Sequence, residues 1–207
     1  MKIHAFNEQA LIRDLDRVPR RLRVLFAAAA AERLMPAYVR FTNRTGRGDP
    51  ATLASILGRL WANAQSETLD SRQVQKDADL SMSLLPIDSA ATWVPEQAWA
   101  EDAVAALAYA LHCQLSGLSQ DAAWSARRAY EAVDNFVVAQ QETAPNSAQA
   151  EEQILAHPLI QRELSRQQRD LEELLTATAR NLISISQQIH QRAQAESKSV
   201  FQDAAEH

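Results

Sequence analysis

The sequence predicts an all-α fold: a single-domain bundle or array of about six to seven helices with a long C-terminal helix. Only four of the 207 residues are glycine, whereas folds rich in β-strands need turn residues about every 8–12 positions. Alanine, leucine, glutamine and arginine are abundant, and all four favour helices. Apolar residues recur at helical spacing, which argues against a disordered chain.

The length favours one domain, and we expect residues 1–195 to form it and residues 196–207 to be a flexible polar tail. The N-terminus lacks the apolar stretch of a signal peptide, and the longest apolar run covers only residues 24–31. A membrane-spanning helix needs about 18 or more apolar residues. These features predict a cytoplasmic protein with no membrane segment.

Charge is distributed unevenly along the chain. Residues 1–59 carry 11 basic and 5 acidic side chains, whereas residues 60–207 carry 10 and 21. Such asymmetry can mark a basic binding face, or it can mean that the two halves attract each other within the fold or within a dimer. We favour internal pairing.

The first predicted helix covers residues 6–16, with Asn7 as its N-cap. Pro19 follows inside a basic cluster at the start of the next helix, where positive charge opposes the helix macrodipole. We expect acidic residues of the C-terminal half to compensate this cluster, and nucleic-acid binding is the alternative. The cluster consists of Arg17, Arg20, Arg21 and Arg23.

The second helix starts near Pro19, and the block Ala27 to Ala31 favours it strongly. Small side chains allow another helix to approach closely, so this block is the expected crossing point. Pro36 predicts a kinked but nearly continuous helix. Gly46 suits the left-handed position after a helix, and Asp49 with Pro50 suits the start of the next.

The third helix carries an apolar face with helical spacing, formed by Leu53, Ile56, Leu57, Leu60 and Trp61. A weaker helix is predicted over residues 70–82, anchored by Val74, Ala78 and Leu80. A loop is expected over residues 84–95, with Trp93 packed against the core from outside.

Two further helices are predicted in the middle of the chain. The first covers residues 96–115 and ends at Gly117, and its inward stripe is Val104, Leu107, Leu111 and Leu115. Ser119 is the expected N-cap of the second, which runs to about residue 142. Its inward residues are Ala126, Tyr130, Val133 and Val137, and a polar loop follows over residues 143–149.

The last helix is expected to run unbroken over residues 159–195, about 55 Å at 1.5 Å per residue. Its apolar positions are close to a 3.5-residue repeat, which fits either a long bundle helix or the seam of a homodimer. The repeat consists of Ile160, Leu164, Gln167, Leu171, Leu174, Thr178, Leu182, Ile185 and Ile189.

One spaced pattern resembles a bacterial family of unknown function, the YjaG-like proteins (domain of unknown function 416). Its residues are Glu32-Arg33, Pro36, Tyr38, Phe41, Thr45-Gly46, Gly48-Asp49, Trp61, Asp102-Ala103, Leu107, His112, Leu115-Ser116-Gly117, Pro158 and Glu163. The resemblance implies an all-helical single domain in the cytoplasm and implies no activity. This chain departs from the pattern in its tail and in its glutamine-rich last helix.

A candidate functional surface is formed by Glu32, Arg33, Tyr38, Arg44, Arg47 and Asp49. A buried Glu32 needs a partner, and Tyr38 or Arg59 is expected to provide one; the alternative is a ligand-binding or catalytic pocket. The turn at residues 46–49 has glycines and arginines that suit an anion. However, Asp49 repels anions, and the lysine and hydroxyl of a phosphate loop are missing. We therefore favour structural roles for the Glu32-Arg33 pair and for the turn at residues 46–49.

Known catalytic and metal-binding patterns are missing. The histidines lack the spacing of a helical metal site, and one cysteine, Cys113, precludes a multi-cysteine site. His112 and Cys113 are adjacent, so on a helix they point in different directions. We therefore expect no metal, no cofactor and no catalytic residues. The favoured function is a non-enzymatic protein that acts through protein–protein contacts, as a homodimer or with another protein.

Overall fold

The structure is a computed structural model of the chain, and it describes residues 3–66, 68–86, 93–140, 147–178 and 181–200. Within these residues it contains helices and no strand, as the sequence predicts. The described part of the chain forms nine helices rather than about six to seven. They are α1 Glu8–Asp16, α2 Arg20–Thr45, α3 Pro50–Gln65, α4 Ser71–Ser83, α5 Pro95–Ser116, α6 Ser119–Ala139, α7 Ala148–Leu155, α8 Pro158–Leu175 and α9 Leu182–Val200.

Local signals place the first helix ends where they are predicted. The Asn7 side chain accepts a hydrogen bond from the backbone N–H of Ala10 at 2.9 Å, which caps α1. Gly46 ends α2 in the left-handed region at φ 69°, where a residue without Cβ is unstrained. Asp49 caps α3 by accepting from the backbone N–H of Thr52, and Pro50 is its first residue.

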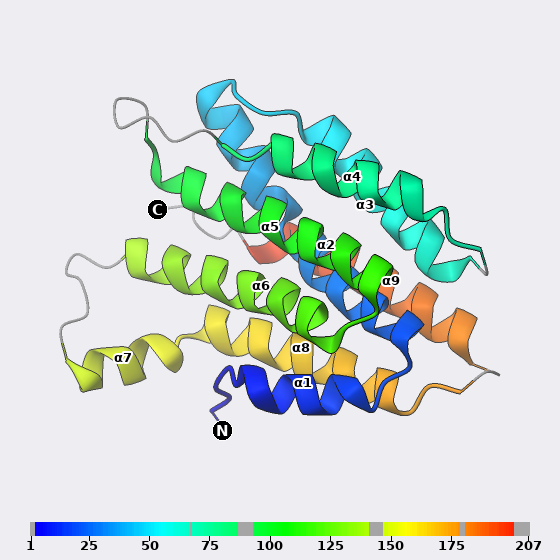
Figure 1. Cartoon of the computed structure of the whole chain (residues 1–207). Helices are drawn as coiled ribbons and strands as arrows, with labels where there is room; N and C mark the ends of the chain where they lie inside the picture. The colour runs from blue at the N-terminus through cyan, green and yellow to red at the C-terminus, as the bar shows by residue number, and fades with distance from the viewer. Residues whose placement is uncertain (1–2, 67, 87–92, 141–146, 179–180, 201–207) are drawn as a thin grey trace.

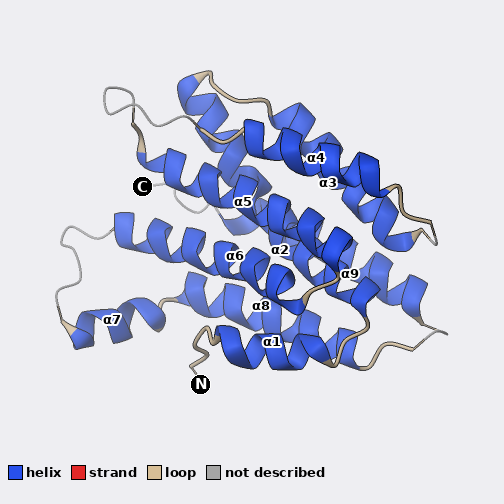
Figure 2. Ribbon diagram, in the orientation of Figure 1, coloured by secondary structure: helices blue, strands red, loops and turns tan. Residues whose placement is uncertain are grey.

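Helix α2 is the centre of the fold. Figures 1 and 2 show it behind α5 and α6 and beside α9, and it packs against all three. Its block Ala27 to Ala31 is fully buried. The hydroxyl of Ser125 on α6 lies 3.0 Å from the carbonyl oxygens of both Ala27 and Ala106. Such close approach of three helices requires small side chains, so the predicted crossing point is confirmed.

The prediction of one long C-terminal helix is wrong, because the structure has two helices there, α8 and α9. The first ends at Leu175 and the second begins at Leu182. Both pack on α2, and α8 also packs on α6. Seven of the nine repeat positions are therefore buried within one chain, with Ile160 and Ile189 fully buried, whereas Leu182 is half-buried and Thr178 is exposed. The buried positions are not available as a dimer seam.

Four further differences concern single elements. The expected loop to residue 149 contains the start of α7, at Ala148. Ser119 is the first residue of α6 rather than its cap, because its hydroxyl donates to Asp16 at 2.6 Å. Leu80 and Trp93 are exposed, not core residues.

Three predicted segments, the C-terminal tail and two loops, are only partly described. Helix α9 continues to Val200, so the expected tail does not begin at residue 196. Glu196 forms an ion pair with Arg169 on α8, which ties it to the folded domain. The remainder of that tail, residues 201–207, and residues 87–92 and 141–146 of the two predicted loops lie outside the described residues.

Candidate functional site

The structure separates the six predicted surface residues into different environments. Glu32 and Arg33 are neighbours in the chain but have different partners: Glu32 faces α3 and α9, whereas Arg33 faces α8 and α9. Tyr38 and Arg47 lie with Asp49 at the turn between α2 and α3. Arg44, on the last turn of α2, is exposed.

Arg33 is the centre of a buried charge cluster. Its side chain is 1% exposed, and its Nε lies 3.0 Å from Oε2 of Glu163 on α8. Arg33 Nη1 donates to Asp170 at 2.8 Å, and Glu196 lies 3.7 Å away on α9. Burial alone would lower the pKa of Arg33, but the negative charges of Glu163 and Asp170 raise it above its usual value. Arg33 therefore stays charged.

The same cluster joins α8 to α9. Arg192 on α9 donates to Asp170 at 2.7 Å and to Glu173 at 2.8 Å. Arg169 on α8 binds Glu196 on α9. Together with Arg33, these contacts connect three helices through opposite charges. Because Arg33, Glu163 and Asp170 are enclosed and paired, the cluster is a brace between helices rather than an open site.

Glu32 has partners other than the expected ones. Its carboxylate accepts a hydrogen bond from the indole Nε1 of Trp61 on α3 at 2.9 Å, and Nε2 of His190 on α9 lies 4.0 Å away. The rings of Trp61 and His190 stack with centroids 4.2 Å apart. Burial raises the pKa of Glu32, and the Trp61 hydrogen bond opposes that rise. Arg59, an expected partner, instead binds Asp77 at 2.7 Å.

Tyr38, the other expected partner, holds the turn between α2 and α3. Its hydroxyl donates to the carbonyl of Leu84 at 3.0 Å and accepts from the backbone N–H of Asp49 at 3.2 Å. Hydrogen bonds from Thr52 lower the pKa of the Asp49 carboxyl, so a negative charge occupies the start of α3. A hollow of about 200 Å³ adjoins this turn, and Arg47 is the one predicted surface residue that lines it.

Three arginines of the basic cluster, Arg20, Arg21 and Arg23, face the ends of helices and not the acidic side chains of the C-terminal half that we expected. Arg17, at the end of α1, pairs with Asp14 of that helix. Arg21 donates to the carbonyl of Ala64 near the end of α3 at 3.0 Å. Arg23 and Arg20 reach the end of α5. Unpaired carbonyl groups give a helix C-terminus a negative partial charge, which compensates the arginines. The acceptors of Arg20 and Arg23 are the carbonyls of Ser116, Gly117, Val18 and Asp16.

Cys113 and His112, for which we expected no catalytic role, lie in different environments. Cys113 is fully buried, and burial raises its pKa to about 12, whereas its neighbour His112 is exposed. In the part of the chain that the structure describes, no three His, Cys, Asp or Glu side chains gather as metal ligands. No helix there is long and apolar enough to cross a membrane.

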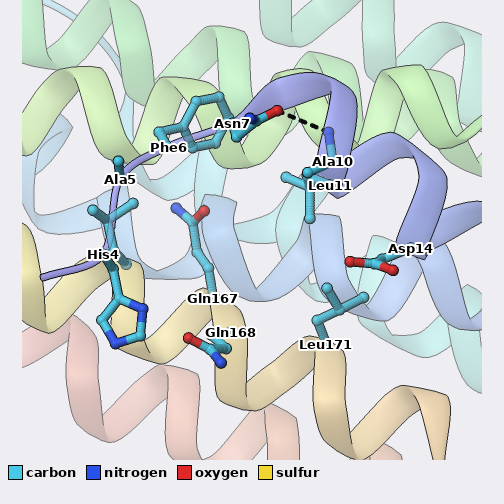
Figure 3. A pocket seen from close by; sticks show the side chains of 11 residues that line it. His4, Ala5, Phe6, Asn7, Ala10, Leu11, Asp14, Gln167, Gln168 and Leu171 are labelled. Atoms are coloured by element: carbon cyan, nitrogen blue, oxygen red, sulfur yellow. Dashed lines mark hydrogen bonds between the residues drawn. The ribbon is translucent and has the colours of Figure 1, made fainter. Parts of the chain in front are cut away.

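One hollow of about 250 Å³ lies between the N-terminal segment and α8 (Figure 3). Phe6 and Leu11 form apolar walls, and Gln167 points into it. The amide of Gln167 already donates to the carbonyl of Ala126 and to Glu163 at 3.0 and 2.9 Å. The amide group of Gln167 is therefore committed to the fold.

An aromatic pair on the outer face of α5 and α6 escaped the sequence analysis. Trp124 is 37% exposed, and its ring lies 5.2 Å from that of Tyr109. Helical spacing puts Arg127 and Arg128 beside Trp124. The sequence could have indicated this pair, because Trp124 falls on the charged side of α6 and not on its alanine-rich side.

Ion pairs surround this aromatic pair. Arg128 binds Asp102 on α5 at 3.2 Å and Glu131 at 2.9 Å, and Arg127 binds Glu131 at 2.7 Å. Figure 1 shows α5 and α6 side by side at the front of the molecule. We name Tyr109, Trp124, Arg127 and Arg128 the aromatic face. It combines an apolar centre with a charged border.

Comparisons with known proteins agree with this fold. A family profile described as "Protein of unknown function (DUF416)" matches residues 11–200. The structure is similar to the crystal structure of a DUF416 family protein from Shewanella baltica OS155, with a TM-score of 0.74 and 21% identity. The similarity covers 87% of this chain and 93% of that one. No curated protein matches the chain. The chain belongs to the DUF416 family of proteins of unknown function.

Proposed function

We propose that this protein is not an enzyme and acts by binding another protein through the aromatic face of α5 and α6. The observation that carries the proposal is the exposure of Trp124, which is paired with Tyr109. Tryptophan is usually buried in a single chain, and tryptophan, tyrosine and arginine are enriched among the residues that dominate binding energy at protein interfaces.

The surroundings of Trp124 support the same proposal. Typical interfaces have an apolar centre and a polar, solvent-accessible border, and here the border is formed by the ion pairs of Arg127 and Arg128. A homodimer remains one form of the proposal. It would use this face, because most of the apolar repeat in α8 and α9 is buried. We further propose a bacterial, cytoplasmic setting, which the family resemblance implies.

The two alternatives receive less support from the contacts. A ligand-binding or catalytic pocket would need Glu32, Arg33 and Tyr38 near one another, but they face different partners. Binding of nucleic acid would need free guanidinium groups, but Arg21 and Arg23 donate to helix carbonyls.

Site-specific photo-crosslinking in living cells tests the proposal. A benzophenone amino acid replaces Trp124, and the matched control carries it at Gln75, an exposed position on α4. We expect one discrete crosslinked species from position 124 and none from position 75. A species of twice the chain mass means a homodimer, and any other mass means a different partner. A second change, Tyr109→Arg, should weaken the crosslink. Equal crosslinking at both positions, or none at 124, would overturn the proposal.

A further inference from the structure

A hollow of about 450 Å³ lies where the N-terminal segment, α6 and α7 meet. Figure 1 shows α7 beside the C-terminal end of α6. One wall is a stripe on α6 formed by Tyr130, Asp134 and Val138, spaced four residues apart and therefore on one helix face. The opposite wall includes Glu151 and Ile154 of α7, and Phe6 closes one side. The size is within the usual range for small-ligand pockets.

The charge of this hollow has one sign. Asp134 and Glu151 line it, and among the described residues no lysine or arginine does. Neither carboxylate has a hydrogen-bond or ion-pair partner among residues that the structure describes. The nearby cations on α6 are already used, since Arg127 binds Glu8 and Glu131, and Arg128 binds Asp102 and Glu131.

The two carboxylates have different surroundings. Asp134 is partly buried on α6, and α6 has no basic residue in its last turn to offset the negative end of the helix. Glu151 is exposed in the first turn of α7, where the helix dipole stabilises a negative charge. Asp134 therefore supplies charge inside the hollow and Glu151 supplies it at the rim.

The remaining walls are aromatic and aliphatic. The rings of Phe6 and Tyr130 stack in parallel with centroids 5.4 Å apart. An aromatic ring attracts a cation through its negative face, and Val138 and Ile154 offer apolar surface to an alkyl chain. A metal ion does not suit this lining, because in the described chain no three carboxylate, histidine or cysteine side chains gather.

We propose that this hollow binds an organic cation: a primary ammonium group on an alkyl chain. The ammonium group pairs with Asp134 and Glu151, and the alkyl chain packs between Tyr130 and Ile154. Free alkylamines and the side chain of a lysine carry the same chemistry. This site is separate from the aromatic face of α5 and α6, and it does not depend on the function proposed for that face.

Calorimetric titration of the intact protein tests the site with four probes. These are 1,4-diaminobutane, n-butylammonium, the lysine analogue Nα-acetyl-lysine amide and the neutral isostere 1-pentanol. We expect saturable binding of at least one amine and none of 1-pentanol at the same concentration. Stronger binding of the free amines would indicate a small-molecule ligand, and stronger binding of the lysine analogue would indicate a protein side chain. Failure of all three amines to bind, or equal binding of 1-pentanol, would overturn the proposal.

Three charge-removing variants locate the site. Asp134→Asn is nearly isosteric and should weaken amine binding by about tenfold or more, since a hydrogen bond to a charged group is lost. Glu151→Gln should weaken it by up to about fivefold, as for an exposed ion pair. Glu152→Gln is the matched control, because Glu152 neighbours Glu151 on α7 and does not line the hollow. Glu151 is exposed, so its substitution tests the site without disturbing the core. Equal affinities in all three variants would overturn the assignment.

Discussion

Arg33 on α2 and Glu163 on α8 form a buried ion pair between residues that are 130 positions apart. Their side chains are 1% and 2% exposed. Asp170 binds the same guanidinium group at 2.8 Å and is joined in turn to Arg192 on α9. The central helix is thereby connected to both helices of the C-terminal pair through one chain of charges.

Removing the charge of Arg33 should destabilise the protein strongly. Arg33→Met leaves Glu163 buried without its cation and removes one of the arginines that bind Asp170, another being Arg192. Breaking a buried pair in this way costs about 3–5 kcal/mol. Denaturation with urea at pH 7 measures this loss. The control Arg44→Met removes an exposed arginine from the same helix and should change the free energy of unfolding by less than about 0.5 kcal/mol.

A second exchange separates lost charge from lost packing. Adding Glu163→Gln to Arg33→Met removes one orphaned carboxylate and should restore part of the stability. If Arg33→Met costs no more than Arg44→Met, or if the double variant is less stable than Arg33→Met, the charge cluster is not the brace that we describe.

The hydrogen bond from Trp61 to Glu32 should be measurable and dependent on pH. Trp61→Phe removes the indole donor, and loss of a hydrogen bond to a carboxylate costs about 1.5–3 kcal/mol. The pKa of Glu32, already raised by burial, should then rise further. The loss should be largest at neutral pH and smaller at acidic pH, where Glu32 is protonated.

Urea denaturation at pH 7.5 and at pH 4, below the ordinary glutamate pKa of 4.5, provides that comparison. In a Glu32→Gln background the same tryptophan exchange should cost less, because a neutral amide oxygen accepts a weaker hydrogen bond than a carboxylate. An equal cost in both backgrounds would mean that packing of the ring, not its hydrogen bond, stabilises this contact.

Asp102 on α5 should titrate at an unusually high pH. Burial raises the pKa of its carboxyl to about 6 from 3.8, and Arg128 opposes the rise only in part. The folded protein therefore holds this proton more tightly than the unfolded chain. The contribution of Asp102 to stability falls as pH rises from about 4 to 6, by about 3 kcal/mol in all.

Carbon-13 NMR of the Asp102 carboxyl gives its titration midpoint directly. The variant Asp102→Asn should lack this component of the pH dependence when unfolding is measured between pH 4 and 7. A midpoint near 4, the ordinary value of an aspartate, would contradict this prediction, because it would show that the ion pair with Arg128 fully offsets burial.

Two glycines with nearly the same backbone should respond differently to alanine. Gly46 and Gly117 end α2 and α5 at φ 69° and 68°, and alanine is strained at either position by about 1 kcal/mol. An added Cβ at Gly46 meets open space, whereas at Gly117 it would overlap the guanidinium group of Arg20. Gly117→Ala should therefore cost more than Gly46→Ala.

Thermal unfolding of the two alanine variants, with and without Arg20→Ala, checks the explanation. The difference between them should shrink when Arg20 is absent, because only the overlap distinguishes the sites. A difference that persists in the Arg20→Ala background would place its cause elsewhere in the turn.

Helix ends could be predicted from the sequence because they depend on residues within about four positions of each other. Asn7, Gly46, Asp49 and Gly117 each act on the turn next to them, so their roles follow from residue type alone. The crossing at Ala27 to Ala31 was equally accessible, because small side chains permit close helix contact wherever the partner comes from.

The break between α8 and α9 could not be predicted from neighbouring residues in this way. An apolar repeat of about 3.5 residues is satisfied by one long helix or by two helices that both pack on α2, and no glycine or proline marks residues 176–181. The partners of Glu32 and Arg33 depend on that break, because it brings His190 and Glu196 back to the central helix. Local residue types determined which segments are helical, whereas contacts between residues far apart in the chain decided what the charged side chains bind.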